Sequence, residues 1–272
     1  MFRRPRSLLR SLEVARGQIT RSSRSIGTLN DSEVAKFGAM NRDWWDQNGQ
    51  NSPLHSLNKL RVGYVRDLLR KTVSNPPPGL PLFGKKILDV GCGGGILAEG
   101  LAQLGAEVTA IDASEELISV AEERRKRKGI ENLTYLDVLV EDLQEIESRF
   151  DLVISSEVLE HVEEPWAFVA YCSNLVKKDG DLVLTTINRT IQSRILAIEL
   201  AERFAGLLPR GTHDWDKFVT VEELIMDLRE VKFRVEDIKG MRWNPFTNEW
   251  QWSNSLDVNY LLHAKDDKSF MS

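Results

Sequence analysis

The sequence is poor in cysteine and has no long hydrophobic run. Cys92 and Cys172 are the only two cysteines in 272 residues, so a disulfide scaffold is not expected and both thiols are predicted to be free. Cysteine and histidine nowhere have the spacing of a zinc site. No apolar segment approaches the roughly 18 to 20 residues that a membrane-spanning helix needs. The length of 272 residues is enough for one large domain or two small ones, and with 42% hydrophobic residues the chain is expected to build a core.

Residues 1–30 have almost no acidic residues. They contain seven arginines, no lysine and the single acid Glu13, so they carry a charge of +6 and leave −11 for the rest of a chain whose net charge is −5. Leu8, Leu9 and Leu12 can share a helical face. This composition is typical of a mitochondrial transit peptide, but also of a disordered basic tail or of an arm that binds acidic lipid or RNA. The acidic remainder argues against general nucleic-acid binding, which needs a basic surface.

Residues 31–272 carry the pattern of an α/β domain. Two helices are predicted first: Asp31 can cap one whose apolar stripe starts at Val34, and the second spans about 57–71. A proline-rich linker at 75–79 ends the second helix. Apolar strands then alternate with helices of about 9 to 15 residues, which predicts βαβ crossovers and a parallel sheet covered on both faces.

The predicted fold is therefore a doubly wound, seven-stranded, mostly parallel α/β sheet with N-terminal helices and a helical insertion at about 188–222. One of the last two strands is expected to be antiparallel at the sheet edge. The predicted strands span 86–90, 107–111, 133–136, 150–155, 181–186, 232–240 and 258–264, and the helices between them span 96–104, 114–128 and 165–176.

A glycine-rich turn joins the first strand to the first helix of this alternation. Gly91 and Gly93 begin a G-x-G-G-G pattern, and glycine lets the backbone approach a ligand closely. Asp112 ends the second strand, where a carboxylate can accept hydrogen bonds from both hydroxyls of a ribose. The pattern departs from the dinucleotide fingerprint G-x-G-x-x-G/A, because Ile96 stands where the fingerprint has its third glycine or alanine. The turn also lacks the lysine of a Walker motif. The turn therefore predicts a nucleoside-containing ligand other than a dinucleotide.

Residues after the third and fourth strands are predicted to reach the same ligand, because the carboxyl ends of parallel strands meet at one edge. Val140 and Asp142 would lie beside an adenine, although both can equally be ordinary loop residues. Ser156 ends the fourth strand, next to the first.

Two acids and a histidine follow Ser156. Glu157, Glu160 and His161 stand at i, i+3 and i+4, which share one face if the segment forms a helical turn. Two carboxylates and an imidazole can hold a divalent cation or position a phenol proton, and a metal bound to both oxygens of a catechol would lower the phenol pKa. The alternative is a helix start, where glutamate is favoured by the helix dipole.

Several strings in the chain resemble known methyltransferases. The glycine turn is similar to the first motif of class I S-adenosylmethionine methyltransferases, a broad superfamily. More specific strings make the stretch from about 34 to 265 resemble the ubiquinone-biosynthesis O-methyltransferases. These strings lie at 57–64, 156–162, 209–214, 244–248 and 257–263.

The resemblance implies an enzyme that moves a methyl group from S-adenosylmethionine to a catechol hydroxyl of polyprenylated ubiquinone precursors, in both O-methylation steps. It implies Mg²⁺ held by Glu157, Glu160 and His161, with Glu160, His161 and His213 as catalytic candidates. The bacterial members have methionine at the position of Ser156, so a side-chain contact there is specific to part of the family. The residues expected to bind S-adenosylmethionine are Arg61, Gly91, Gly93, Asp112, Val140 and Ser156.

The resemblance also implies a place for the protein: peripheral, on the matrix side of the mitochondrial inner membrane, in a multisubunit biosynthetic complex. Residues 191–208 predict an amphipathic helix that either covers the core or lies at a membrane surface. Trp243, Trp250 and Trp252 either wall the substrate pocket or pack at the sheet edge. His213 is either an acid–base group or part of a structural loop.

Two other functions would use the same glycine turn. One is methyl transfer to another small phenol or amine, and a test for turnover of a prenylated catechol distinguishes it. The other is a non-catalytic subunit that binds S-adenosylmethionine and scaffolds an assembly. Binding of S-adenosylmethionine without turnover of any catechol would indicate this second function. The complete glycine turn, Asp112 and the acid cluster argue against the second.

Overall fold

The computed structural model describes residues 44–49, 51–146, 149–193, 217–244 and 246–267. The predicted transit peptide, the predicted first helix up to residue 43, most of the predicted insertion, and His213 lie outside the described residues.

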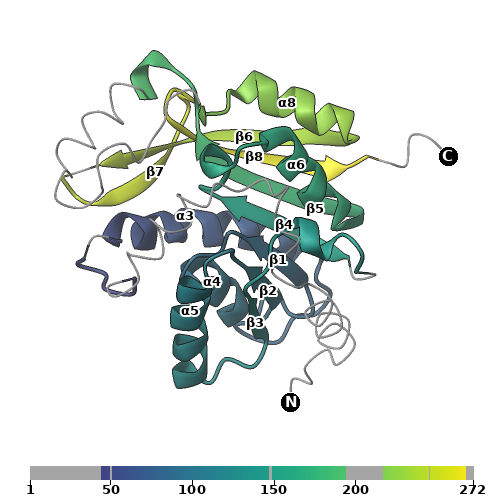
Figure 1. Ribbon diagram of the computed structural model, residues 1–272. Helices are drawn as coiled ribbons and strands as arrows, with labels where there is room; N and C mark the ends of the chain where they lie inside the picture. Colours follow the sequence, from purple (N-terminus) through teal and green to yellow (C-terminus); the bar gives the residue numbers. More distant parts are fainter. Residues whose placement is uncertain (1–43, 50, 147–148, 194–216, 245, 268–272) are drawn as a thin grey trace.

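One twisted sheet forms the centre of the described part of the chain (Figure 1). Its eight strands have the order β3-β2-β1-β4-β5-β8-β6-β7, and β1 to β5 are mutually parallel. The strands are β1 (Lys86–Val90), β2 (Glu107–Ile111), β3 (Leu133–Leu136), β4 (Phe150–Ser156), β5 (Val176–Ile187), β6 (Phe233–Asn244), β7 (Glu249–Ser253) and β8 (Asn259–Asp266).

The prediction of a doubly wound, mostly parallel sheet is confirmed, with two differences. The sheet has an eighth strand, β7, which forms a hairpin with β6 and occupies the edge. The antiparallel strand β8 lies inside the sheet between β5 and β6, not at the edge. The chain reaches this slot only after β6, so strand order in the sequence did not reveal its place.

Helices cover both faces of the sheet, as its continuous apolar strands require. α6 and α8 pack on one face, and α3, α4 and α5 on the other (Figure 1). The helices are α3 (Ser52–Leu69), α4 (Ile96–Gln103), α5 (Glu115–Lys128), α6 (Pro165–Asn174) and α8 (Val221–Glu230), with 3₁₀ turns η3 (Arg70–Thr72), η4 (Glu141–Leu143) and η5 (Leu159–His161).

Capping residues in the sequence explain where the helices begin and end. The Ser114 hydroxyl accepts a hydrogen bond from the Leu117 amide at the start of α5, and Gly129 ends that helix in a left-handed conformation. Thr220 and Glu223 form a reciprocal capping box at the start of α8. The predicted cap at Ser114 is therefore confirmed.

The strand order places the functional residues. The chain winds outward from β1 in two directions, through β2 and β3 on one side and through β4 and β5 on the other. Ligands of doubly wound sheets bind at the carboxyl ends of the strands where the order reverses. Gly91, Asp112 and Ser156 lie at the ends of β1, β2 and β4, on this one edge.

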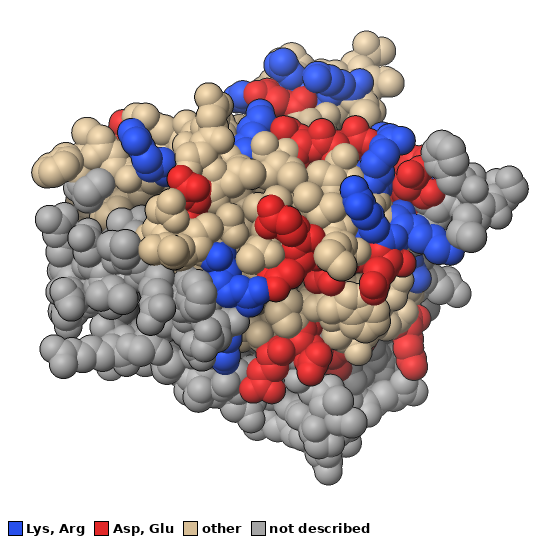
Figure 2. Space-filling model, turned by 90° about the horizontal axis from the view of Figure 1, so that it is seen from above, with Lys and Arg blue, Asp and Glu red and all other residues tan. Residues whose placement is uncertain are grey.

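The outer surface carries charges of both signs. Figure 2 shows acidic and basic side chains interspersed with uncharged ones on the face seen from above, which is the arrangement of a solvated surface of mixed charge. Among the described residues, no helix is both long and apolar enough to cross a membrane.

The capping box of α8 gives a stability prediction. Thr220→Ala removes the hydroxyl that accepts from the Glu223 amide and should lower the free energy of unfolding by about 1 kcal/mol. Urea denaturation of the two proteins measures this difference. Thr247→Ala, at an exposed turn residue outside any helix, is the control and should stay within about 0.5 kcal/mol of the parent. Equal midpoints for Thr220→Ala and the parent would contradict the assignment.

Candidate active site

The glycine turn has the backbone that its sequence predicted. Gly91, Gly93 and Gly95 have φ of 73°, 53° and 87°, in the region that favours glycine. The amides of Gly91 and Cys92 both donate to the Ile111 carbonyl at 2.9 Å, which ties the turn to the end of β2. Gly95 is the N-cap of α4 and supplies no side-chain cap, so the first amides of the helix lack a capping side chain.

Asp112 is held against this turn. One carboxylate oxygen accepts from the Gly93 amide at 2.8 Å and the other from the Ser114 amide at 2.9 Å. Burial raises the pKa of Asp112, and these backbone donors lower it in part. The carboxylate therefore has a fixed orientation between the end of β2 and the glycine turn, and its contact with a ribose stays a prediction.

Arg61 is a buried cation on α3, with a side chain that crosses to the end of β4. The residue is 5% exposed, and its guanidinium donates to the Ser156 hydroxyl at 2.9 Å and to the Asn58 side-chain oxygen at 3.3 Å. Its Nε has no partner among the described residues. Burial lowers the pKa of Arg61, while the charges of Glu157 and Asp89 raise it. The guanidinium thus donates to neutral groups in the structure and can still donate hydrogen bonds to the carboxylate of a ligand.

Asp89 is the complementary buried anion. It lies on β1 two residues before Gly91 and is 1% exposed, and its Oδ2 has no partner among the described residues. Burial raises the pKa of Asp89 to about 7, with the Asp112 charge adding to the rise and the Arg61 charge opposing it. An unsatisfied buried acceptor of this kind favours a cationic ligand group nearby.

A chain of hydrogen bonds links Arg61 to Glu157. Ser156 accepts from Arg61 and bonds the Thr185 hydroxyl at 2.6 Å, and Thr185 donates to Glu157 at 2.7 Å. The other oxygen of Glu157 accepts from the Asn259 amide at 3.0 Å. Sequence reasoning missed Thr185 and Asn259. The signal for Thr185 was a polar Thr-Thr pair near the end of its strand, and Asn259 lies within the string at 257–263 that carries the resemblance.

Glu160 is close enough to Glu157 for the charges of the two carboxylates to interact. Glu160 is 4% exposed and accepts from the Thr186 hydroxyl at 2.7 Å. Burial and the neighbouring charge of Glu157 raise the pKa of Glu160 to about 8. Burial raises the pKa of Glu157 as well, while hydrogen bonds from Thr185 and Asn259 oppose that rise.

The predicted helical turn through this cluster is wrong. Glu157 has φ of 58°, a left-handed conformation, and only 159–161 form a short 3₁₀ turn. Glu157, Glu160 and His161 therefore do not share one helical face. Among the described residues, no three histidine, cysteine, aspartate or glutamate side chains are grouped so that they could hold a metal ion. The structure brings together the two carboxylates but not the complete predicted ligand set.

The loop after β3 contains Val140 and Asp142. Val140 is 3% exposed and its carbonyl accepts from Gln144 at 2.9 Å. The Asp142 carboxylate accepts from the Leu139 amide at 3.0 Å and stabilises the 3₁₀ turn that follows. Asp142 thus has a local structural role, and contact of Val140 with an adenine stays a prediction.

The three C-terminal tryptophans lie on the edge hairpin. Trp243 on β6 is the register partner of Trp250 on β7 and donates to the Asn248 side chain at 3.1 Å. The Trp252 ring lies 5.8 Å from that of Tyr64 on α3. All three thus lie on the edge hairpin, and Trp252 packs against α3. A role in walling the substrate pocket stays a prediction.

Comparisons with known proteins agree with this geometry. A family model described as "Methyltransferase domain" matches residues 88–184. Magnesium protoporphyrin IX methyltransferase from Synechocystis PCC 6803, solved with bound S-adenosylhomocysteine, has a similar fold. The TM-score is 0.58 at 21% identity, and the match covers 87% of this chain and 95% of that one.

Curated relatives are much more similar in sequence. The mitochondrial ubiquinone biosynthesis O-methyltransferase of Rattus norvegicus is 43% identical over 240 residues, covering 87% of this chain and 70% of the relative. The Homo sapiens protein of the same name is 42% identical over 245 residues, covering 89% and 66%.

The ubiquinone biosynthesis O-methyltransferase of Sinorhizobium fredii is 41% identical over 239 residues, covering 88% of this chain and 96% of the relative. The chain thus spans about two thirds of the mammalian relatives and nearly all of the bacterial one. Identity at this level over this length, with the glycine turn, Asp112 and Arg61 assembled at one sheet edge, shows that the chain belongs to the ubiquinone biosynthesis O-methyltransferase family.

Proposed function

We propose that this protein transfers the methyl group of S-adenosylmethionine to a catechol hydroxyl of polyprenylated ubiquinone precursors, in both O-methylation steps. As a member of its family the chain is an S-adenosylmethionine-dependent O-methyltransferase. One observation carries the proposed cofactor site: the buried Arg61 guanidinium bonds neutral groups, while the buried Asp89 has an oxygen without a partner among the described residues.

S-adenosylmethionine has charged groups of opposite sign to the two buried side chains of this site. Its carboxylate would bind Arg61, and its ammonium group would face Asp89. Its ribose hydroxyls would donate to Asp112. Gly91 and Gly93 would let the backbone approach the ligand. Ser156 would line the pocket through its bond to Arg61, and Val140 would lie beside the adenine.

The proposed reaction is an in-line displacement. A catechol oxygen attacks the sulfonium methyl carbon, the bond from that carbon to sulfur breaks, and S-adenosylhomocysteine leaves with the electron pair. The hydroxyl proton passes to a base, for which Glu160, His161 and His213 are the candidates. Because the sulfonium is already activated, positioning of the two reactants supplies most of the acceleration.

Magnesium is a separate part of the proposal. The resemblance implies Mg²⁺ at Glu157, Glu160 and His161, and the two glutamates would supply the oxygen ligands that Mg²⁺ prefers. Two carboxylates whose charges repel each other favour a cation nearby, but the described residues contain no group of three side chains that could hold a metal ion. When bound, Mg²⁺ would acidify the catechol and hold its oxygens.

We place the protein in the mitochondrion, peripherally on the matrix side of the inner membrane and in a multisubunit complex. The mitochondrial names of the mammalian relatives and the composition of residues 1–30 support the compartment. Ile191, at the start of the predicted amphipathic segment, is 72% exposed, and Phe246 on the β6–β7 turn is 94% exposed. Such side chains suit contact with lipid or with a prenyl tail.

A methyl-transfer assay tests the function as a whole. With labelled S-adenosylmethionine and a short-tailed prenyl catechol, the expected result is a labelled product methylated on oxygen. Transfer only to another phenol or amine would favour the first alternative function. Binding of S-adenosylhomocysteine with no transfer to any acceptor would favour the scaffold.

Arg61→Gln removes the proposed partner of the cofactor carboxylate. Calorimetric titration should show binding of S-adenosylhomocysteine weakened roughly 10- to 100-fold, because a hydrogen-bonded charge pair is lost. Binding of 5′-methylthioadenosine, which has no carboxylate, should change little. Arg66→Gln, an exposed arginine of the same helix, is the control and should bind both compounds like the parent. An equal loss for both compounds in Arg61→Gln would contradict this role.

Asp89 predicts how cofactor affinity depends on pH. Its pKa of about 7 means that the carboxyl group is mostly neutral at pH 6 and mostly charged at pH 8. Since the charged form attracts the ligand ammonium, affinity for S-adenosylhomocysteine should rise as pH increases through 7. In Asp89→Asn this rise should disappear, whereas the exposed Asp67→Asn should keep it. A parent affinity that stays constant from pH 6 to 8 would rule out the pairing.

Glu160 and magnesium should affect transfer but not cofactor binding. Glu160→Gln should lose methyl transfer while its affinity for S-adenosylhomocysteine stays near that of the parent. EDTA should stop transfer in the parent, and excess Mg²⁺ should restore it. Glu163→Gln, exposed in the same loop, is the control and should keep both properties. Full transfer by the parent in EDTA would remove magnesium from the mechanism.

A further inference from the structure

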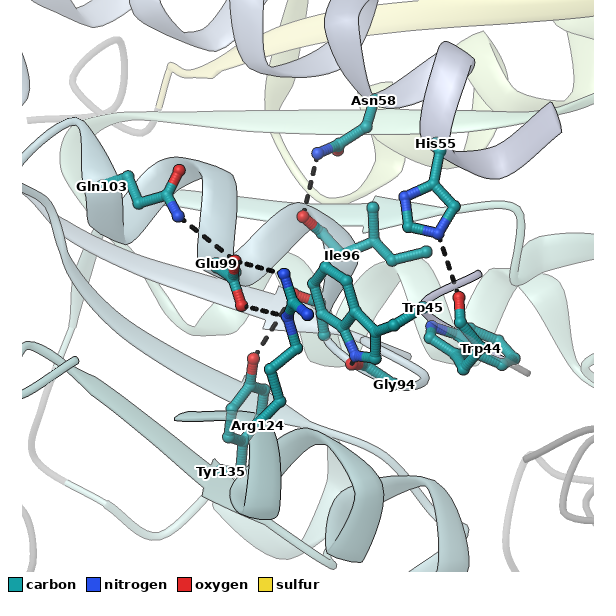
Figure 3. A network of polar contacts seen from close by, with 11 residues as sticks. Trp44, Trp45, His55, Asn58, Gly94, Ile96, Glu99, Gln103, Arg124 and Tyr135 are labelled. Carbon is teal, nitrogen blue, oxygen red and sulfur yellow. Dashed lines mark hydrogen bonds and ion pairs between the residues drawn. The ribbon is translucent and has the colours of Figure 1, made fainter. Parts of the chain in front are cut away.

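Two tryptophans just before α3 lie over the glycine turn (Figure 3). Trp44 is 7% exposed, and its indole lies directly against Gly93 and Gly94. A Cβ atom on Gly93 would stand 2.6 Å from the Trp44 ring, and one on Gly94 would stand 2.2 Å from it. Neither position could carry a side chain while Trp44 occupies this place.

The indole N–H of Trp44 is buried and unused. It has no acceptor among the described residues. Indole nitrogen is a donor only, and a buried donor without an acceptor costs free energy. The Gly93 amide beneath the indole donates to Asp112, the proposed ribose partner. The unused donor therefore belongs to the same small region as the proposed cofactor site.

Neighbouring residues hold this arrangement in place, as Figure 3 shows. The Trp45 indole donates to the Gly94 carbonyl at 3.1 Å, and its ring is covered by the Arg124 guanidinium at 3.5 Å from the ring centroid. Arg124 makes two hydrogen bonds to Glu99, of 2.7 and 3.1 Å. Trp44 is thus positioned by α4 and α5 through the residue next to it.

The Trp44 backbone is held as well. A ring nitrogen of His55 on α3 lies 3.0 Å from the Trp44 carbonyl. The Trp44 side chain packs with Ile96 of α4 and Leu117 of α5. An indole fixed from three helices, with its one polar atom left without an acceptor, has the arrangement of a preorganised binding group.

We propose that Trp44 is a cofactor-binding residue: its indole covers the ligand at the glycine turn, and its N–H donates to an oxygen of that ligand. This proposal rests on the proposed S-adenosylmethionine site. It also gives a reason for glycine at position 94 that differs from close approach of the ligand, namely the space that the Trp44 ring needs.

Trp44→Phe tests the hydrogen bond, because phenylalanine keeps a ring over the turn and removes the N–H. Calorimetry on the full chain should show S-adenosylhomocysteine bound about three- to tenfold more weakly than by the parent. 5′-Methylthioadenosine identifies the acceptor. A loss with both compounds places it on the ribose or base, and a loss with S-adenosylhomocysteine alone places it on the amino-acid carboxylate.

Trp166→Phe is the matched control. Trp166 is 50% exposed on α6 and its N–H bonds Glu230, so this variant should bind like the parent. Thermal unfolding of unliganded Trp44→Phe should match the parent, which separates lost binding from lost fold. If the parent binds and Trp44→Phe binds equally tightly, the Trp44 proposal is wrong. If the parent itself fails to bind, the proposed cofactor site is wrong instead.

A double-mutant cycle tests the role of Gly94. Gly94→Ala alone should weaken S-adenosylhomocysteine binding by at least tenfold, because the new methyl group displaces Trp44. In a Trp44→Ala background, which is already weakened, adding Gly94→Ala should change affinity less than threefold. A penalty of the same size in both backgrounds would show that Gly94 is needed for the ligand itself and would overturn this explanation.

Discussion

The guanidinium of Arg61 lies buried between α3 and the end of β4, and hydrogen bonds through Ser156 and Thr185 connect it to the carboxylate of Glu157. A buried charge is tolerated only when polar groups surround it. This constraint links a helix outside the sheet to the ends of two central strands. It therefore aligns the proposed cofactor side of the site with the side that contains Glu157 and Glu160.

Three buried polar atoms near the glycine turn have no hydrogen-bond partner among the described residues: Arg61 Nε, Asp89 Oδ2 and Trp44 Nε1. A further one, Trp250 Nε1, lies on the edge hairpin. Each such atom costs stability in the unliganded protein. The three near the glycine turn are a cationic donor, an anionic acceptor and a neutral donor. A nucleoside that carries a carboxylate, an ammonium group and hydroxyl groups could form hydrogen bonds with all three. Under the proposed function, binding of such a ligand at the glycine turn would also stabilise the folded chain.

Much of the fold was readable from local sequence. The strands at 86–90, 107–111 and 133–136 were predicted at their observed bounds, because buried parallel strands need continuous apolar runs and glycine or polar turns end them. The edge strand β7 was missed, because an exposed strand needs no such run. The interior place of β8 was also missed, because pairing between strands distant in sequence leaves no local pattern.

For the site, local sequence was enough to predict the available chemistry: a glycine turn, an acid at the end of β2 and two glutamates after β4. These depend on residue type and on spacing within one strand and its loop, which are local properties. Which groups meet depends on packing between segments that are distant in the sequence. This packing joined Asn259 to Glu157 across 102 residues and set Trp44 over the glycine turn. It also broke the expected helical turn at Glu157, because contacts between distant segments outweigh local preference.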